Sequence, residues 1–284
     1  MRIISDLVKF QKDSEDQIDF WSFLLYYICM NRMIEFKPCR KCSKPGAGPA
    51  PGYYYEKVDG FDVVKECACH KSWRERKDNF YAFSRAGVLG STTENDYLGT
   101  QSLQDLKCLM KVKDNPEKFK DKCIYVWGPN GTQKTSMCMY LGRELIKKGY
   151  SVKYILFNKL VSDLQPTFNT SDEEEERRRA LNVSDCRNVD FLILDEVFDR
   201  AKNTLFKSGY QIPFIDEFLR TRVDIDNKGI IFISNVKSCD IEKEGYSKSL
   251  QDFVERHTCR STLEFKDRYS REVSIIDPKS LFED

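Results

Sequence analysis

The chain contains Cys123-Ile-Tyr-Val-Trp-Gly-Pro-Asn-Gly-Thr-Gln-Lys-Thr135, an apolar run followed by a glycine-rich turn and a Lys-Thr pair. This order predicts a buried strand, a turn and the first residues of a helix. Main-chain N–H groups of such a turn and helix N-terminus can surround an anionic phosphate chain, and the helix dipole favours its negative charge. The stretch therefore predicts a phosphate-binding loop, in which Lys134 reaches the β- and γ-phosphates and the Thr135 hydroxyl holds Mg²⁺. Its candidate nucleotide-binding residues are Gly128, Pro129, Asn130, Gly131, Thr132, Gln133, Lys134 and Thr135.

One residue of this loop departs from the usual pattern G-x-x-x-x-G-K-[ST], because Gln133 stands where the second glycine belongs. A glycine there lets the main chain lie close to the phosphates. A glutamine side chain must point away, or it crowds the β-phosphate. The departure predicts weak ATP binding, or binding without efficient turnover. An ordinary strand, turn and helix without phosphate binding is the alternative.

Downstream residues favour the phosphate-binding interpretation. The run Val189–Glu196 is an apolar strand of the kind that is covered on both faces, and it ends in two carboxylates. Asp195 is placed to hold the Mg²⁺ shell, and Glu196 is placed to polarise an attacking water. A solvated strand end is the alternative. The intervening chain supplies a helix, a strand and a helix at Lys134–Lys148, Val152–Phe157 and Asn158–Leu164.

A third apolar strand, Gly229–Asn235, also ends in polar side chains. Ser234 and Asn235 are placed to reach the γ-phosphate or to orient water, although an asparagine at a strand end is also a common turn former. Further on, Arg256 and Arg260 are candidates for an arginine that meets the nucleotide of a neighbouring subunit. A surface or core-edge arginine is the alternative for both.

Four of the eleven cysteines are clustered in sequence. Cys39 and Cys42 form a C-x-x-C pair, and Cys67 and Cys69 follow about 25 residues later in C-x-C-H. Four thiolates in two pairs fit a tetrahedral Zn²⁺ site, which would stabilise a small segment with little core of its own. His70 is an alternative ligand in place of one cysteine, and free thiols or a redox pair are the other interpretations. The remaining cysteines are predicted to be reduced thiols.

Composition limits the class of protein. At 284 residues, with 46 basic and 45 acidic side chains, the net charge of +1 excludes a strongly basic nucleic-acid-binding protein but leaves room for a local patch. The apolar segment Phe20–Met33 is too short to span a bilayer, and the N-terminus lacks a signal pattern. We expect a cytoplasmic protein without a membrane partner.

The chain is expected to fold as two parts. Residues 1–90 would hold a helical segment at 1–33, the zinc module and a basic-aromatic helix at Lys71–Arg85, and residues 91–284 would form the ATPase domain. Glutamates four positions before arginines predict an exposed helix near Ser171–Ala180. A hairpin is expected at the end of the chain, from Ser261–Phe265 and Arg271–Ile275.

Taken in order, these motifs resemble the DnaC/DnaI-type helicase loaders of bacteria and phages, AAA+ ATPases related to the transposon ATPase IstB. The resemblance covers most of the chain from about Pro38 and depends on Cys39–Cys42, Cys67–Cys69, Gly128–Thr135, Leu194–Glu196, Ile215–Arg222, Gly229–Asn235 and the helix near Arg256. It implies an α/β fold, namely an AAA+ P-loop three-layer ATPase domain with a parallel sheet, preceded by a small zinc-binding N-terminal domain. Residues 1–33 are not explained by it.

The resemblance also implies roles for single residues and partners for the chain. Asp195 and Glu196 would be the Walker B pair, Asn235 the sensor 1 residue and Arg256 the arginine finger, with a sensor-2-like part for Arg268 or Arg271. The N-terminal region would contact the helicase, and the ATPase domain would bind ATP between subunits and touch single-stranded DNA.

The functional expectation is an ATP-dependent loader, phage or bacterial, with ATP, Mg²⁺ and Zn²⁺ as cofactors. It would bind a hexameric replicative DNA helicase and deliver it to single-stranded DNA during replication initiation, with weak ATP hydrolysis at most. Two alternatives stay open. One is an IstB-like transposition ATPase, and the other is a non-hydrolysing adaptor with a degenerate P-loop.

Overall fold

The computed structural model describes residues 35–90, 92–97, 102–165, 173–200, 202 and 212–265. The helix expected within residues 1–33, the hairpin arm Arg271–Ile275 and the candidate residues Arg268 and Arg271 lie outside these residues. The chain divides into two compact units, Met1–Phe80 and Tyr81–Asp284, and each is described by itself. The predicted start of the ATPase domain at residue 91 stays a prediction.

The first unit is built on a two-stranded antiparallel hairpin. Strands β1 (Tyr53–Val58) and β2 (Phe61–Glu66) pair with Val58 opposite Phe61, so that only Asp59 and Gly60 connect them. Both connecting residues have positive φ, 52° and 85°, which is the geometry of a tight hairpin turn whose twist matches that of the strands. Helix α3 (Ala68–Ala86) begins two residues after β2 and contains the predicted basic-aromatic segment.

The second unit contains a parallel sheet with strand order β4-β5-β6-β3-β7 among the described residues. Its strands are β3 (Ile124–Trp127), β4 (Val152–Leu156), β5 (Phe191–Asp195), β6 (Ile230–Ser234) and β7 (Thr262–Glu264). The apolar runs around Val189–Glu196 and Gly229–Asn235 are therefore strands β5 and β6, as predicted. Both are buried along their whole length, because helices cover the two faces of the sheet.

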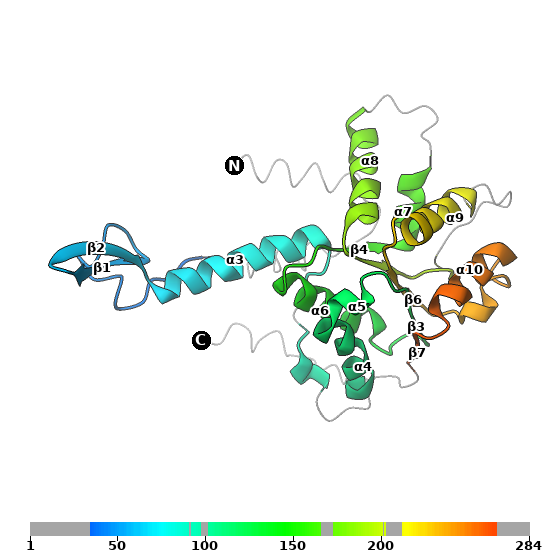
Figure 1. The fold of residues 1–284 in the computed structure, drawn as a ribbon, viewed down its shortest axis with the longest axis horizontal. Coiled ribbons are helices and arrows are strands. Elements are labelled where there is room, and N and C mark those ends of the chain that lie inside the picture. Colours follow the sequence, from blue (N-terminus) through cyan, green and yellow to red (C-terminus); the bar gives the residue numbers. More distant parts are fainter. Residues whose placement is uncertain are drawn as a thin grey trace, which may run out of the picture. The chain divides into compact units, whose positions relative to one another are not determined.

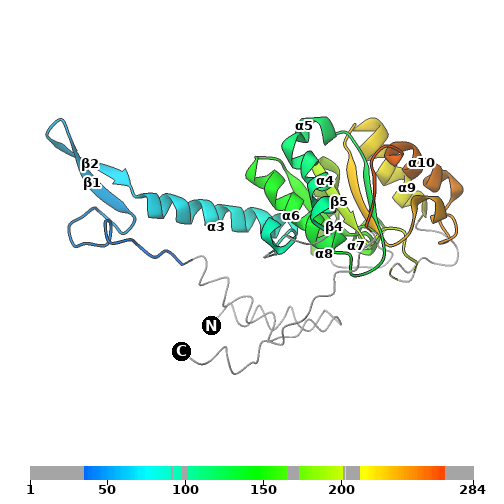
Figure 2. The same cartoon turned by 90° about the horizontal axis from the view of Figure 1, so that it is seen from below.

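Two hydrophobic clusters, one on each face, make the unit a three-layer structure. Alternate strand residues point to opposite faces, so Leu192 and Leu194 pack in one cluster while Phe191 and Ile193 pack in the other. Figures 1 and 2 show the covering helices on either side of the sheet. One face is covered by α4 (Ser102–Asp114) and α6 (Lys134–Lys147), and the other by α7 (Phe157–Leu164), α8 (Glu173–Asn188), α9 (Ile212–Arg220) and α10 (Lys248–Thr258).

Short elements complete the described part of this unit. They are the helix α5 (Pro116–Phe119), the 3-10 turns η1 (Glu94–Tyr97) and η3 (Ser238–Asp240), and the π-helical turn η2 (Thr221–Ile225). The charged segment near Ser171–Ala180 begins helix α8, where Arg179 pairs with Glu175 at 2.9 Å. Within the described residues, no helix combines the length and the apolar character that a membrane crossing requires.

The first arm of the hairpin expected at the end of the chain forms a strand, and the second arm lies outside the described residues. Thr262–Glu264 forms β7, which lies parallel to β3 in the main sheet, with Val126 opposite Leu263. The main-chain N–H of Phe265 then donates to the carbonyl of Trp127, at 2.8 Å. Alternating residues identify a strand, but they do not say which strand it pairs with. Here the open edge of β3 provides the partner.

Candidate nucleotide-binding site and cysteine cluster

The predicted phosphate-binding loop lies where three parallel strands end. Trp127 at the end of β3 is opposite Ser234 at the end of β6, and β6 is also paired with β5, which ends at Asp195. The side chains that follow these strands therefore meet at one edge of the sheet. They line a pocket of about 420 Å³, which is formed by Asn130, Gly131, Gln133, Lys134, Thr135, Ser136, Met139, Asp195, Glu196, Lys202, Ile233, Ser234 and Asn235.

Two residues of the predicted phosphate-binding loop have unusual main-chain conformations. Gly128 has φ of 153° and lies so close to Phe265 that a Cβ atom would come within 2.1 Å of the Phe265 carbonyl oxygen. Gln133 has φ of 64° and ψ of 18°, a left-handed conformation that costs a non-glycine residue about 1 to 2 kcal/mol. This conformation is the physical reason why glycine is usual at that position.

The side chain of Gln133 lies along the first turn of α6. The Ser136 hydroxyl is 3.0 Å from the Gln133 carbonyl oxygen and 3.4 Å from the Gln133 side-chain oxygen, and it donates to both. The glutamine nevertheless contributes to the lining of the pocket. The departure from the pattern therefore acts in two places, as strain in the main chain and as extra volume at the pocket wall.

Lys134 is buried and turned back onto its own loop. Its ammonium group donates to the carbonyls of Gly128 and Pro129, both at 2.8 Å, and to the side chains of Thr132 and Asn235, both at 3.2 Å. Burial lowers the pKa of Lys134 to about 8, although the negative charge of Asp195 acts in the opposite direction. Neutral carbonyl groups do not cancel the positive charge of the ammonium. We therefore expect Lys134 to exchange these carbonyls for an anionic phosphate, which forms a stronger, charge-assisted hydrogen bond.

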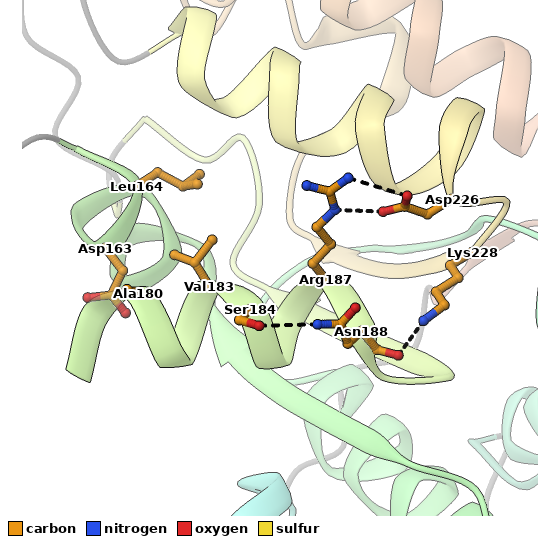
Figure 3. A pocket seen from close by; sticks show the side chains of 9 residues that line it. All are labelled: Asp163, Leu164, Ala180, Val183, Ser184, Arg187, Asn188, Asp226 and Lys228. Carbon is orange, nitrogen blue, oxygen red and sulfur yellow. Dashed lines mark hydrogen bonds and ion pairs between the residues drawn. The ribbon is translucent and has the colours of Figure 1, made fainter. Parts of the chain in front are cut away.

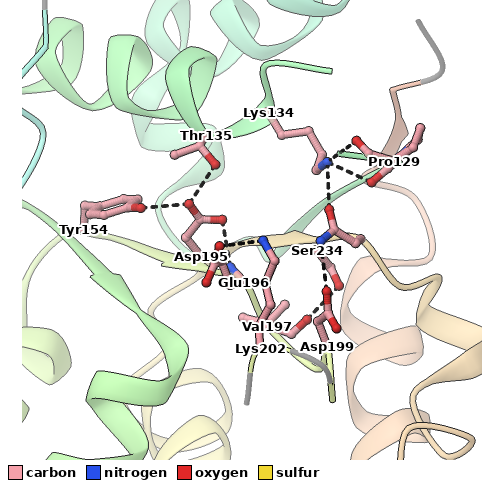
Figure 4. A network of polar contacts seen from close by, with 12 residues as sticks. Pro129, Lys134, Thr135, Tyr154, Asp195, Glu196, Val197, Asp199, Lys202 and Ser234 are labelled. Atoms are coloured by element: carbon pink, nitrogen blue, oxygen red, sulfur yellow. Dashed lines mark hydrogen bonds and ion pairs between the residues drawn. The ribbon is translucent and has the colours of Figure 1, made fainter. Parts of the chain in front are cut away.

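Asp195 is fixed by three hydrogen bonds (Figure 4). Its Oδ2 accepts from the Thr135 hydroxyl and from the Tyr154 hydroxyl, both at 2.8 Å, and its Oδ1 accepts from the main-chain N–H of Glu196 at 2.7 Å. Burial raises the pKa of Tyr154, so the phenol keeps its proton and acts as a donor. The predicted Mg²⁺ residues, Thr135 and Asp195, are therefore direct neighbours.

Tyr154 is a site residue that the sequence analysis missed. It lies on β4, opposite Ile193 of β5, two positions before the residue opposite Asp195. A tyrosine in a predicted strand is usually interpreted as a core residue. The one sequence feature that could have indicated its role is that its strand precedes the strand that ends in Asp195. Its role is visible only once the register of β4 against β5 is known.

Glu196 and Asn235 are both held by charged residues of the turn that follows β5. Lys202 lies 2.6 Å from Oε1 of Glu196, and the Asn235 amide donates to Asp199 at 2.9 Å. The side-chain oxygen of Asn235 accepts from Lys134, so the asparagine links the loop to this turn. Lys202 and Asp199 were also missed, because the segment after Glu196 carries no motif.

The structure does not bring Arg256 or Arg260 to this pocket. Arg256 lies on α10 with 63% of its side chain exposed, 3.9 Å from the carboxylate of Asp224, and Arg260 is exposed just beyond the helix. Neither contributes to the pocket lining. A role for Arg256 at the nucleotide of a neighbouring subunit stays a prediction.

A larger pocket, of about 780 Å³, lies elsewhere on the second unit and contains none of the predicted site residues (Figure 3). It is lined by Asp163, Leu164, Ala180, Val183, Ser184, Arg187, Asn188, Asp226 and Lys228. Its charged groups satisfy one another, since Arg187 pairs with Asp226 at 2.7 Å and Lys228 donates to the Asn188 carbonyl. The predicted site residues therefore line the smaller of these two pockets, where the strand ends converge.

The four predicted zinc ligands come together in the first unit. The Sγ atoms of Cys39, Cys42, Cys67 and Cys69 all lie within 4.8 Å of one another, and the closest pairs are 3.4 to 3.8 Å apart. Tetrahedral zinc with Zn–S bonds of 2.3 Å requires sulfur separations of about 3.8 Å, so the cluster has the right size for the ion. Hydrogen bonding from the main chain of Cys42 and Lys41 lowers the pKa of Cys39 to about 6, which favours the thiolate form.

His70 does not belong to this cluster. Its Nδ1 lies 2.7 Å from a carboxylate oxygen of Glu66, and its ring stacks among Phe36, Tyr53 and Trp73 with centroid distances of 5.0 to 5.2 Å. Gly52 allows this packing, because a Cβ atom there would meet the imidazole at 2.7 Å. The histidine is thus a packed residue beside the cysteines.

The fold and the loop define the class of protein. Numbered along the chain, the strands of the parallel sheet lie in the order 5-1-4-3-2, with the phosphate-binding loop after the first strand and Asp195 after the third. This is the arrangement of an AAA+ P-loop ATPase domain, and it confirms the α/β fold expected from the sequence. The part of the first unit that the structure describes adds a four-cysteine cluster able to hold zinc.

Comparison with known proteins gives a more particular likeness, although no family model matches the chain. The chain is similar to the replicative helicase loader DnaC of Buchnera aphidicola subsp. Baizongia pistaciae (strain Bp), with 31% identity over 93 residues. The match spans 32% of this chain and 37% of the length of that relative.

Solved structures give likenesses at lower identity. DnaI is 16% identical with a TM-score of 0.47, covering 63% of this chain and 92% of the other. The DnaC helicase loader is 16% identical with a TM-score of 0.42, covering 67% and 98%. The replication initiator DnaA bound to AMPPCP and single-stranded DNA is 18% identical with a TM-score of 0.48, covering 63% and 50%.

Proposed function

We propose that this protein is an ATP-dependent loader that binds a hexameric replicative DNA helicase and delivers it to single-stranded DNA during replication initiation. One observation carries the ATP-dependent part of the proposal, namely the meeting of Lys134, Thr135 and Asp195 at the edge of a parallel sheet. The similarity to a DnaC loader over 93 residues supports the assignment to helicase loading.

In this proposal the pocket holds ATP with Mg²⁺. Main-chain N–H groups of Gly128–Thr135 and the Lys134 ammonium would bind the phosphates, and Thr135 and Asp195 would hold the metal. The bound Mg²⁺ would neutralise charge on the phosphate oxygens. Glu196 would act as the base toward water, and Asn235 would sense or orient the terminal phosphate.

Slow turnover is part of the proposal. Gln133 holds the loop in a strained main-chain conformation, and its side chain adds volume to the lining of the pocket. Nucleotide would then act mainly as a conformational switch. A non-hydrolysing adaptor is the second candidate, and the same two observations favour it.

The cysteine cluster and Arg256 complete the proposed machinery. Cys39, Cys42, Cys67 and Cys69 would hold one structural Zn²⁺ in the N-terminal region that contacts the helicase. Arg256, exposed on α10, would reach the nucleotide of a neighbouring subunit in a self-assembled complex.

The proposal is tested by co-purification with the candidate helicase, with and without ATP, followed by transfer of the helicase to a single-stranded DNA circle. Lys134→Ala should abolish ATP binding in calorimetry and ATP-dependent transfer. Lys147→Ala is the matched control, because that lysine lies on the same helix and pairs with Glu144 at the surface. If Lys134→Ala binds ATP with unchanged affinity, the assignment of the nucleotide site is wrong. If the helicase is not recovered, the assignment of the helicase as partner is wrong.

A further inference from the structure

Lys202 is a second cation in the proposed nucleotide pocket. Its ammonium lies 2.6 Å from Oε1 of Glu196, and both residues line the pocket together with Lys134. Figure 4 shows Lys202 beside the polar network that connects the loop to the ends of β5 and β6. Nothing in the sequence pattern marks this lysine, since it lies six positions after Glu196 in a segment without a motif.

The two lysines are held in different ways. Lys134 is 6% exposed, and its ammonium has acceptors on the loop and on Asn235. Lys202 is about one-third exposed, and among the described residues its ammonium pairs with the carboxylate of Glu196. A lysine on a long stem can exchange one anionic partner for another at small cost in geometry.

The charges of these groups favour such an exchange. Lys202 and Lys134 line the same pocket, so the two ammonium groups share one electrostatic environment. A triphosphate brings more negative charge into this environment than Glu196 alone supplies. Ammonium groups bind phosphate oxygens with strong charge-assisted hydrogen bonds, so a terminal phosphate can compete with Glu196 for Lys202.

We propose that Lys202 is a ligand of the terminal phosphate, and that its transfer from Glu196 to this phosphate lets the site distinguish a nucleoside triphosphate from a diphosphate. This inference rests on the proposed function of the pocket. The transfer also removes the Lys202 ammonium from Glu196, the residue that the proposed function assigns as the base toward water.

The test compares the affinities of the non-hydrolysable analogue AMP-PNP and of ADP, each with Mg²⁺, by calorimetry on the full chain. In Lys202→Ala, AMP-PNP should bind about tenfold more weakly, as expected for one charge-assisted hydrogen bond, while ADP affinity stays unchanged. Lys202→Arg should keep the preference for AMP-PNP. Lys243→Ala is the matched control, because Lys243 pairs with Asp240 at 2.5 Å outside the pocket, and it should behave as wild type.

A second pair of variants separates direct binding from simple neutralisation of Glu196. Glu196→Gln should bind AMP-PNP more tightly than wild type, because the competing carboxylate is gone, and the double variant Lys202→Ala/Glu196→Gln should remain weak. If Glu196→Gln instead restores AMP-PNP binding to Lys202→Ala, the lysine only neutralises the glutamate and the inference is wrong. An unchanged ratio of AMP-PNP to ADP affinity in Lys202→Ala also overturns it. If the wild-type protein binds neither nucleotide, the proposed function itself is wrong. That result differs from the two outcomes that contradict only the role of Lys202.

Discussion

The Thr135 hydroxyl donates a hydrogen bond of 2.8 Å to Oδ2 of Asp195, a residue 60 positions further along the chain. Thr135 lies in the first turn of helix α6 and Asp195 ends strand β5, so the bond ties the predicted phosphate-binding loop to the centre of the sheet. A hydroxyl and a carboxylate in contact form a ready pair of oxygen ligands for Mg²⁺.

Gln133→Gly should strengthen nucleotide binding. Glycine adopts the left-handed conformation at φ 64° without strain and removes the side chain from the pocket wall. We expect ATP affinity to rise because the side chain no longer crowds the phosphates, and we expect the free energy of unfolding to rise by about 1 kcal/mol because the main-chain strain is relieved. Gln133→Ala is the informative control in calorimetry, because it removes the amide but keeps the Cβ atom. Equal affinities for wild type and both variants would contradict this account of the glutamine.

Tyr154→Phe should weaken Mg²⁺ binding and destabilise the fold slightly. The variant removes one of the three hydrogen bonds that orient Asp195, at a cost of about 1 kcal/mol in the free energy of unfolding. More Mg²⁺ should then be needed for half-maximal ATP binding, as measured by titration. Tyr150→Phe removes an exposed hydroxyl bonded to Glu117 and serves as the control. A Mg²⁺ requirement that is identical in both variants would argue against a positioning role for Tyr154.

Nucleotide binding should be accompanied by proton uptake at alkaline pH. Burial lowers the pKa of Lys134 to about 8, so the lysine is largely neutral at pH 9 and must be protonated to bind phosphate. Calorimetry in buffers of different ionisation enthalpy should report uptake of about one proton per ATP at pH 9 and almost none at pH 7. Lys134→Arg, whose guanidinium stays protonated, should take up none. Absence of uptake in the wild type at pH 9 would show that the lysine is charged throughout.

The same pKa predicts that the stability of the fold depends on pH. The unfolded chain binds more protons than the folded one between pH 8 and the ordinary lysine pKa of 10.5, so this residue makes the fold more stable as pH rises through that window. The destabilisation from the buried charge is complete below about pH 8. Comparison of wild type with Lys134→Met in urea at pH 7 and pH 9.5 measures it, and the difference between the two proteins should shrink at the higher pH.

Arg222→Met should destabilise the second unit strongly. Arg222 is fully buried in the π-helical turn, and its guanidinium donates to the carbonyls of Cys186, Arg187, Val189 and Gly229 at 2.7 to 3.2 Å. Without it these carbonyls lose their partner, at a cost of about 3 kcal/mol or more in the free energy of unfolding. Arg178→Met removes an exposed pair with Glu175 and should cost about 1 kcal/mol or less. Similar urea midpoints for the two variants would contradict the structural role.

Metal analysis should find about one zinc per chain. Cys42→Ser removes a buried Sγ from the cluster and should lower both the zinc content and the thermal stability of the first unit. Cys239→Ser, at an exposed cysteine outside the cluster, should change neither. A metal-free preparation with the same thermal stability as the wild type would remove the zinc assignment.

The loop and its two supporting strands were predictable because their signals are local. A glycine-rich turn before Lys134 and an apolar run before Asp195 are each contained in a few consecutive residues. Since parallel strands carry their carboxyl ends to one edge of a sheet, the two segments had to meet if both strands belonged to it. The four cysteines were predictable for the same reason, because paired thiols at short spacing are a local pattern.

The sequence by itself determined the strands of the parallel sheet and the residue types that stand at their ends. Only the tertiary structure decided that Tyr154 supports Asp195, that Lys202 engages Glu196 and that β7 pairs with β3. The physical reason is that these relationships depend on strand register and on side chains meeting across the fold. Strand register and contacts between distant side chains produce no repeating pattern of residues in the sequence.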